Sequence, residues 1–179
     1  MLRILGYICI SCLLLACEPI SDDPGTNILE DDRLPNQESW NSQVAVSSEG
    51  HRNVMARADY MAQFEKPREI LFIGNVQLDF FNMDGGHTST MLADTGRIDD
   101  RRSLFTATGN VIVESDSGMT LTTTELHWQE KKERIFTDAA IRLTSTTDTL
   151  YGIGFESDAS LENWVIHTPT GVSYRELAE

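Results

Sequence analysis

Strict alternation of apolar and polar residues between positions 105 and 128 constrains the fold of this chain more than any other feature. Four apolar residues are spaced by polar ones: Phe105, Ala107, Val111 and Val113. A period of two is typical of a β-strand with one apolar face. A turn cluster at residues 115–118 follows, and the alternation resumes at Leu121. The stretch therefore predicts a β-hairpin whose apolar side chains share one face.

Short internal repeats relate this hairpin to the rest of the chain. Gly109-Asn110-Val111 repeats Gly74-Asn75-Val76, and Ala93-Asp94 repeats Ala58-Asp59, each after a shift of 35 positions. Residues 137–142 are also similar in sequence to residues 108–113, although more weakly. One such unit cannot bury its apolar face alone. The repeats therefore predict stacked hairpin units.

Further segments alternate in the same way and predict more strands, at residues 44–48, 70–80, 135–143, 151–155 and 161–166. Residues 53–65 fit either a strand or an amphipathic helix. The repeat aligns them with the strand-like segment 91–99, which favours strand. Regular strands without a strong helix predict an all-β domain.

The N-terminus has the features of a bacterial lipoprotein signal peptide. Arg3 precedes an apolar run from Ile4 to Ala16, which is shorter than the ~20 residues of a membrane-spanning helix and fits a signal-peptide core. The run ends in Leu14-Leu15-Ala16-Cys17, which resembles the lipobox. This resemblance implies cleavage before Cys17 and a lipid anchor on its sulfur. The alternatives are an ordinary signal peptide with a chance cysteine, or a retained single helix.

The predicted organisation is a signal peptide (1–16), a lipidated cysteine with an acidic flexible linker (17–43) and a β-domain (44–175). The linker contains Asp22-Asp23-Pro24-Gly25 and Glu30-Asp31-Asp32 and has no sustained periodicity, so we expect it to be disordered. We interpret it as a tether between the membrane and the domain.

Charge and cysteine content exclude several classes of function. The net charge of −14 repels phosphate backbones, so we expect no nucleic-acid partner. Cleavage before Cys17 leaves one cysteine, so no disulfide is expected. The four histidines form no metal-binding pair, and no serine lies in a Gly-x-Ser-x-Gly motif. We therefore expect no enzyme activity, metal or cofactor.

Several short motifs, in this order and spacing, resemble the LptC family of lipopolysaccharide-export proteins. They are Gly109-Asn110-Val111, Gly118, Leu121-Thr122-Thr123, Leu126, Trp128, Thr137-Asp138 and Gly152-Ile153-Gly154-Phe155. The wider group includes the LptA-like domains. The resemblance covers roughly residues 44–171. The chain departs from the best-known members, which keep an N-terminal transmembrane helix where this one has a predicted lipid anchor.

The resemblance implies a twisted, boat-shaped antiparallel β-jellyroll with an open apolar groove for the acyl chains of lipid A. It also implies the partners: lipopolysaccharide, an inner-membrane ABC transporter that supplies it, and an LptA-like periplasmic protein docked edge to edge. The implied location is the periplasmic side of the inner membrane, held by the lipid anchor. An outer-membrane location stays open, because sorting rules for residue 18 differ between bacteria.

Ten apolar residues are the candidate lining of this groove: Phe72, Val76, Leu78, Phe80, Val111, Val113, Leu121, Ile141, Phe155 and Trp164. A closed sandwich core predicts the same alternation, so both interpretations remain open at each position. Arg97, Arg101 and Arg102 are candidates to meet lipid phosphates at a rim, although turn arginines are more often simply solvated.

Two other functions are compatible with these observations. The first is a structural or assembly lipoprotein whose β-domain has a closed core and binds proteins instead of lipid. The second is a soluble lipid carrier like LptA, against which the lipobox argues, because a free shuttle has no need of an anchor.

Overall fold

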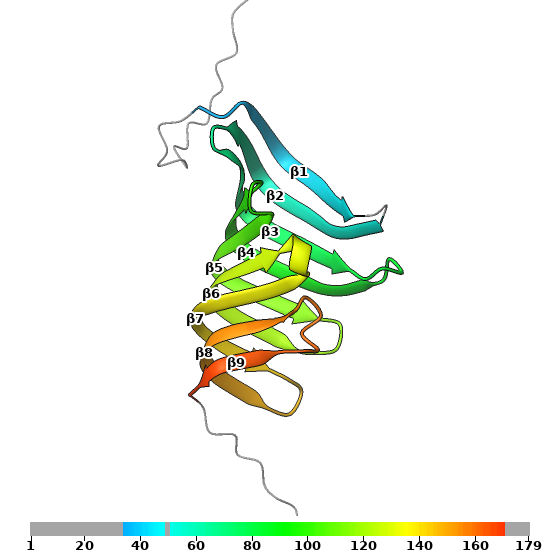
Figure 1. The fold of residues 1–179 in the computed structure, drawn as a ribbon, viewed down its shortest axis with the longest axis vertical. Helices are drawn as coiled ribbons and strands as arrows, with labels where there is room; N and C mark the ends of the chain where they lie inside the picture. The colour runs from blue at the N-terminus through cyan, green and yellow to red at the C-terminus, as the bar shows by residue number, and fades with distance from the viewer. Residues whose placement is uncertain (1–33, 49–50, 171–179) are drawn as a thin grey trace, which may run out of the picture. The chain divides into compact units, whose positions relative to one another are not determined.

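Nine strands pair in the order of the chain to form one antiparallel sheet (Figure 1). The computed structural model describes residues 34–48 and 51–170. The strands are β1 (Gln37–Ser48), β2 (His51–Glu65), β3 (Arg68–Phe81), β4 (His87–Asp99), β5 (Leu104–Ser115), β6 (Thr120–Gln129), β7 (Arg134–Thr144), β8 (Thr149–Asp158) and β9 (Val165–Pro169), and a short 3-10 helix, η1 (Glu130–Lys132), joins β6 to β7. The predicted signal peptide, the predicted anchor Cys17 and most of the predicted linker lie outside the described residues.

The sheet is open, because β1 and β9 are its two edges and do not pair with each other. Every connection joins neighbouring antiparallel strands, so the hairpins predicted from period-two alternation are confirmed. Within the described residues, no helix is long and apolar enough to cross a membrane.

One row of apolar side chains crosses eight strands at matching register positions. It runs through Val44, Ala56, Leu78, Met91, Val113, Leu121, Leu143 and Leu150. Residues paired across antiparallel strands lie on the same face of a sheet. The row therefore gives the sheet a continuous apolar inner face, and this face is the core of the fold.

Bulges on alternate strands interrupt the pairing at one level of the sheet. At this level β3, β5 and β7 each have one residue more than the strands beside them. The extra residues lie at positions 74–75, 109–110 and 138–139. An extra residue bends the strand and increases its twist. Because the three bulges lie along one line across the sheet, they bend it as a whole.

The repeated sequence motifs are the chemical basis of two of these bulges. Gly74-Asn75 and Gly109-Asn110 all have positive φ angles, between 44° and 78°. The side-chain amide of Asn75 donates to Asp59 Oδ2 over 2.7 Å, and that of Asn110 donates to Asp94 Oδ2 over 2.8 Å. Glycine and asparagine tolerate this left-handed conformation better than other residues, which explains why the pair recurs.

The bent sheet folds its inner face onto itself. Phe80 on β3 contacts Trp128 on β6 edge to face, with ring centroids 5.6 Å apart. These strands are not neighbours in the sheet, so the contact spans the interior. Leu161, in the loop between β8 and β9, joins the same core cluster. The interior is therefore closed by the fold of the sheet and by this loop.

Two strand boundaries differ from the predictions, and one ambiguous segment is a strand. Residues 53–65 form strand β2, as the repeat indicated. β1 begins at Gln37, so residues 37–43, assigned to the linker, are strand. These residues are mostly polar and pair through their backbone, so no alternation marked them. The predicted strand 161–166 is wrong for residues 161–164, because β9 begins at Val165 and Leu161 has a φ of 59°.

Gly109→Ala should destabilise the fold, and Gly85→Ala is its matched control. Both glycines have positive φ, but a Cβ on Gly109 would lie 2.4 Å from Asp94 Oδ2, whereas a Cβ on Gly85 would meet nothing within 4 Å. In urea unfolding, we expect the free energy of unfolding to fall by about 2–4 kcal/mol for Gly109→Ala and by about 1–2 kcal/mol for Gly85→Ala. Equal decreases in the free energy of unfolding for the two variants would mean that the contact with Asp94 does not affect stability.

Candidate functional site

Nine of the ten candidate groove residues lie on the inner face and belong to one buried cluster. Their exposed fractions are between 0 and 4%. They come from five strands, β3 and β5 to β8, which the bent sheet brings around one interior. Trp164 is the exception. It precedes β9, is 37% exposed and is not part of the cluster, because the chain leaves the sheet after Asp158 and returns only at Val165.

The interior is filled by side chains in this structure. The cluster also contains residues absent from the candidate list, among them Met91, Leu126, Trp128, Ile135, Leu143 and Leu161. They lie in segments whose alternation predicted strands. For Leu161 that prediction was wrong, since it reaches the core from the loop that precedes β9. The apolar face is thus a packed core here, and an acyl chain would have to part it.

A cavity of about 240 Å³ lies where this interior meets the surface. Phe80 and Trp128 form its inner wall, and Met83 in the β3–β4 turn, 74% exposed, stands at its outer side. Asp158, Ala159 and Ser160 close it from the β8–β9 loop. An apolar cavity of ~150 Å³ already binds benzene, so this one is large enough for part of an acyl chain.

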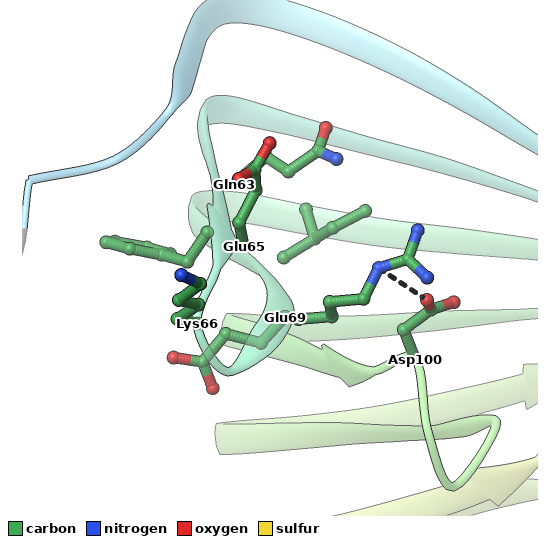
Figure 2. A pocket seen from close by; sticks show the side chains of 8 residues that line it. Gln63, Glu65, Lys66, Glu69 and Asp100 are labelled. Atoms are coloured by element: carbon green, nitrogen blue, oxygen red, sulfur yellow. Dashed lines mark ion pairs between the residues drawn. The ribbon is translucent and has the colours of Figure 1, made fainter.

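Two further cavities are lined mainly by charged and polar side chains. One, of about 460 Å³, lies at the β2–β3 turn and includes Lys66, Glu69 and Asp100 (Figure 2). Arg68 Nε lies 3.5 Å from Asp100 Oδ2 at its border. The other, of about 480 Å³, surrounds residues 130–133. Charged groups line most of both cavities, so they suit a hydrocarbon chain less well than the cavity beside Phe80 and Trp128.

The candidate rim arginines lie at the β4–β5 turn and on the end of β4. Arg97, Arg101 and Arg102 are exposed, and Arg102 Nε lies 3.5 Å from Asp99 Oδ2. No described residues form a group of three potential metal ligands.

Asp79 on β3 is a buried carboxylate on the outer face. It accepts hydrogen bonds from Gln77 Nε2 over 2.7 Å and Thr90 Oγ1 over 3.0 Å, and it forms an ion pair with Arg57. Burial alone would raise the pKa of Asp79, but the hydrogen bonds from Gln77, Thr90 and Arg57 outweigh it and hold the pKa below its usual value. Since every partner is a donor within the sheet, this cluster serves stability.

The fold and its apolar interior define an antiparallel β-jellyroll of the LptA kind. The structure is similar to the crystal structure of LptH, the LptA-homologous periplasmic component of the conserved lipopolysaccharide transport device of Pseudomonas aeruginosa. The TM-score is 0.50 at 12% sequence identity, over 63% of this chain and 80% of that chain. Identity this low establishes the fold alone.

The family is established by sequence. The model of the family described as "Lipopolysaccharide-assembly, LptC-related" matches residues 9–170. The chain therefore belongs to the LptC family, as its motifs indicated, and has a role in lipopolysaccharide transport. No curated protein matches it significantly.

Leu121→Ala should show how tightly the interior is packed. Leu121 is fully buried in the apolar row, whereas Leu92 is 37% exposed on the outer face. In urea unfolding, we expect the free energy of unfolding to fall by about 2–5 kcal/mol for Leu121→Ala and by less than about 1 kcal/mol for Leu92→Ala. The two differ because only the Leu121→Ala substitution leaves a cavity. A small loss at Leu121 would mean that the interior is loosely filled.

Asp79→Asn should destabilise the protein in a pH-dependent way. A carboxyl whose pKa is lowered in the folded state stabilises it above the unfolded pKa of about 3.9, and this stabilisation is lost as pH falls through the folded pKa. We expect the free energy of unfolding, measured with urea, to fall by about 1–3 kcal/mol at pH 7, and this difference to shrink as pH falls below the unfolded pKa of about 3.9 and through the lowered folded pKa. Asp84→Asn, in the exposed β3–β4 turn, is the control. If the free energy of unfolding of Asp79→Asn were lower than that of the wild type by the same amount at every pH, the ionic role of Asp79 would be contradicted.

Proposed function

We propose that this protein is a membrane-tethered component of the lipopolysaccharide-transport bridge. In this proposal it receives lipopolysaccharide from an inner-membrane ABC transporter and passes it to an LptA-like jellyroll in the periplasm. The acyl chains of lipid A enter the apolar interior between the two halves of the bent sheet. The transfer requires no catalytic group, metal or cofactor, only a continuous apolar path.

The uninterrupted apolar row across eight strands, in a chain of the LptC family, is the observation that carries this proposal. Burial of one methylene is worth about 0.8 kcal/mol. Partial burial of several acyl chains therefore offsets the loss of some packing between side chains. The sheet is open at both edges, so its halves are not tied together by a closed ladder of hydrogen bonds.

The two edge strands are the proposed docking sites for the protein partners. β1 has 12 residues and pairs with β2 alone, and β9 has five residues and pairs with β8 alone. An edge strand offers unpaired backbone groups, to which a second sheet can add a strand. Edge-to-edge docking of similar jellyrolls would extend the apolar inner face from one protein to the next.

Lipidation of Cys17 would hold the domain at the membrane. Residues between Cys17 and Gln37 would form the tether. The net charge of −14 disfavours attachment to anionic lipids by charge, whereas two acyl chains suffice for stable anchoring. We place the domain on the periplasmic side of the inner membrane, where the proposed transporter delivers its substrate.

The dense packing of the interior favours one other function. A structural or assembly lipoprotein that binds only proteins would have just such a closed core, with its large side chains fully buried. This candidate differs from the first in that no amphiphile ever contacts the inner face.

Photocrosslinking in living cells distinguishes the two functions. A photoreactive amino acid would replace Phe72, Val111 or Ile141 in turn, followed by immunoblotting for lipopolysaccharide. We expect adducts at these inner positions because the proposed acyl path runs between them. Gln77, on the outer face of β3, is the matched control and should give none. Absence of adducts at all three inner positions in folded protein would rule out the transport proposal in favour of the protein-binding function.

A further inference from the structure

The loop between β8 and β9, residues 159–164, is a compact turn organised by one aspartate. Asp158 accepts hydrogen bonds from Ser160 Oγ over 2.9 Å, from the backbone amide of Glu162 over 2.9 Å and from Asn163 Nδ2 over 2.6 Å. Burial alone would raise the pKa of Asp158, but these hydrogen bonds from Asn163, Glu162 and Ser160 outweigh it and lower the pKa. The loop therefore holds its shape as a unit.

Two serines from distant strands fasten this unit across the interior. Ser89 Oγ on β4 donates to the carbonyl oxygen of Ala159 over 2.5 Å. Ser115 Oγ at the end of β5 donates to the carbonyl oxygen of Ser160 over 2.6 Å. Both bonds join segments far apart in the sequence, and neither belongs to a strand ladder. The loop is thus attached to the opposite side of the bent sheet by side-chain contacts alone.

Leu161 inserts from this loop into the core. Its side chain is 1% exposed, and its φ of 59° lies in the left-handed region. A leucine in this conformation is strained, and such strain persists only where the surrounding structure imposes it. Here the strain is offset by burial of the Leu161 side chain among the inner-face residues.

The 240 Å³ cavity lies directly beside this loop. Asp158, Ala159 and Ser160 form one wall, and Phe80 and Trp128 of the core form another. Movement of the loop away from Ser89 and Ser115 would displace one wall of the cavity and withdraw Leu161 from the core cluster, which includes Phe80 and Trp128 of the other wall. β9, the strand that follows, is short and has only four residue pairs with β8, so it offers little resistance to such a movement.

We propose that residues 159–163 form a lid over the entrance to the apolar interior, with Leu161 as its plug. In the closed state Leu161 occupies a position that an acyl chain takes when the lid opens. The hydroxyl groups of Ser89 and Ser115 are the latch. This proposal rests on the proposed function, because it names where a saturated acyl chain enters the same interior.

Hydrogen exchange tests the movement of the lid in the full chain. The protein would be held in lipid nanodiscs, with and without purified lipopolysaccharide. We expect the amides of residues 159–163 to exchange faster when lipopolysaccharide is present, while the amides of β5 remain protected. In the variant with Ser89→Ala and Ser115→Ala, exchange at these residues should be roughly tenfold faster or more without any ligand, since the closed state has lost two hydrogen bonds.

Crosslinking in cells tests whether the latch controls entry. The photoreactive residue at Val111 would be combined with Ser89→Ala and Ser115→Ala together, with Ser115→Ala alone as a milder variant, and with Leu161→Ala. We expect a severalfold higher yield of lipopolysaccharide adduct over a short labelling time in each case. Thr95→Ala is the matched control, because it removes a hydroxyl-to-carbonyl hydrogen bond on the outer face and should leave the yield unchanged.

The outcomes separate the lid from the transport function. If wild-type protein forms adducts at Val111, but residues 159–163 exchange equally with and without lipopolysaccharide and the latch variants do not alter the yield, then the lid proposal fails and the function stands. If wild-type protein forms no adducts at Phe72, Val111 or Ile141, both proposals fail. Faster exchange of residues 159–163 with lipopolysaccharide, together with raised yields in the latch variants, supports both.

Discussion

The apolar inner face of the sheet dictates how the strands, bulges and loops of this protein are arranged. A single row of aliphatic side chains from Val44 to Leu150 crosses eight strands, and no helix among the described residues is available to cover it. Apolar surface of this extent must be buried. Because the sheet is open at both edges, it can bury the row only by bending onto itself.

The bulges supply that bend, and their chemistry is local. Gly74-Asn75 and Gly109-Asn110 adopt positive φ angles, and each asparagine is held by an aspartate of the preceding strand. Residues on either side of a bulge, such as Phe72 and Val76, both remain buried. The sheet therefore changes direction without exposing its apolar side chains to water.

A packed interior and a transport role place opposite demands on the same residues. The inner face must be covered when no lipid is present, since exposed apolar surface of this size invites aggregation. In the proposed function, it must also open when an acyl chain arrives. The proposed lid, a loop held by two serine hydroxyls and one leucine, would satisfy both demands, because it is separate from the strand ladders that stabilise the sheet. The open edges of β1 and β9 leave the halves of the sheet free to part.

Most of the strands, the apolar residues of the inner face and the family could be predicted from the sequence, because period-two alternation, the Gly-Asn repeats and the LptC-like motifs are all local signals. Nine of the ten residues predicted to line a groove lie in the buried cluster, and contact of these residues with lipid stays a prediction. The polar part of β1 and the position of Trp164 were not predictable, since they depend on backbone pairing and on a turn around Asp158. The entry of Leu161 into the core from a loop, and the hydrogen bonds of Ser89 and Ser115 to that loop, became evident from the three-dimensional fold alone. These contacts join segments 45 and 70 residues apart, and no local pattern encodes a contact across the interior of a bent sheet.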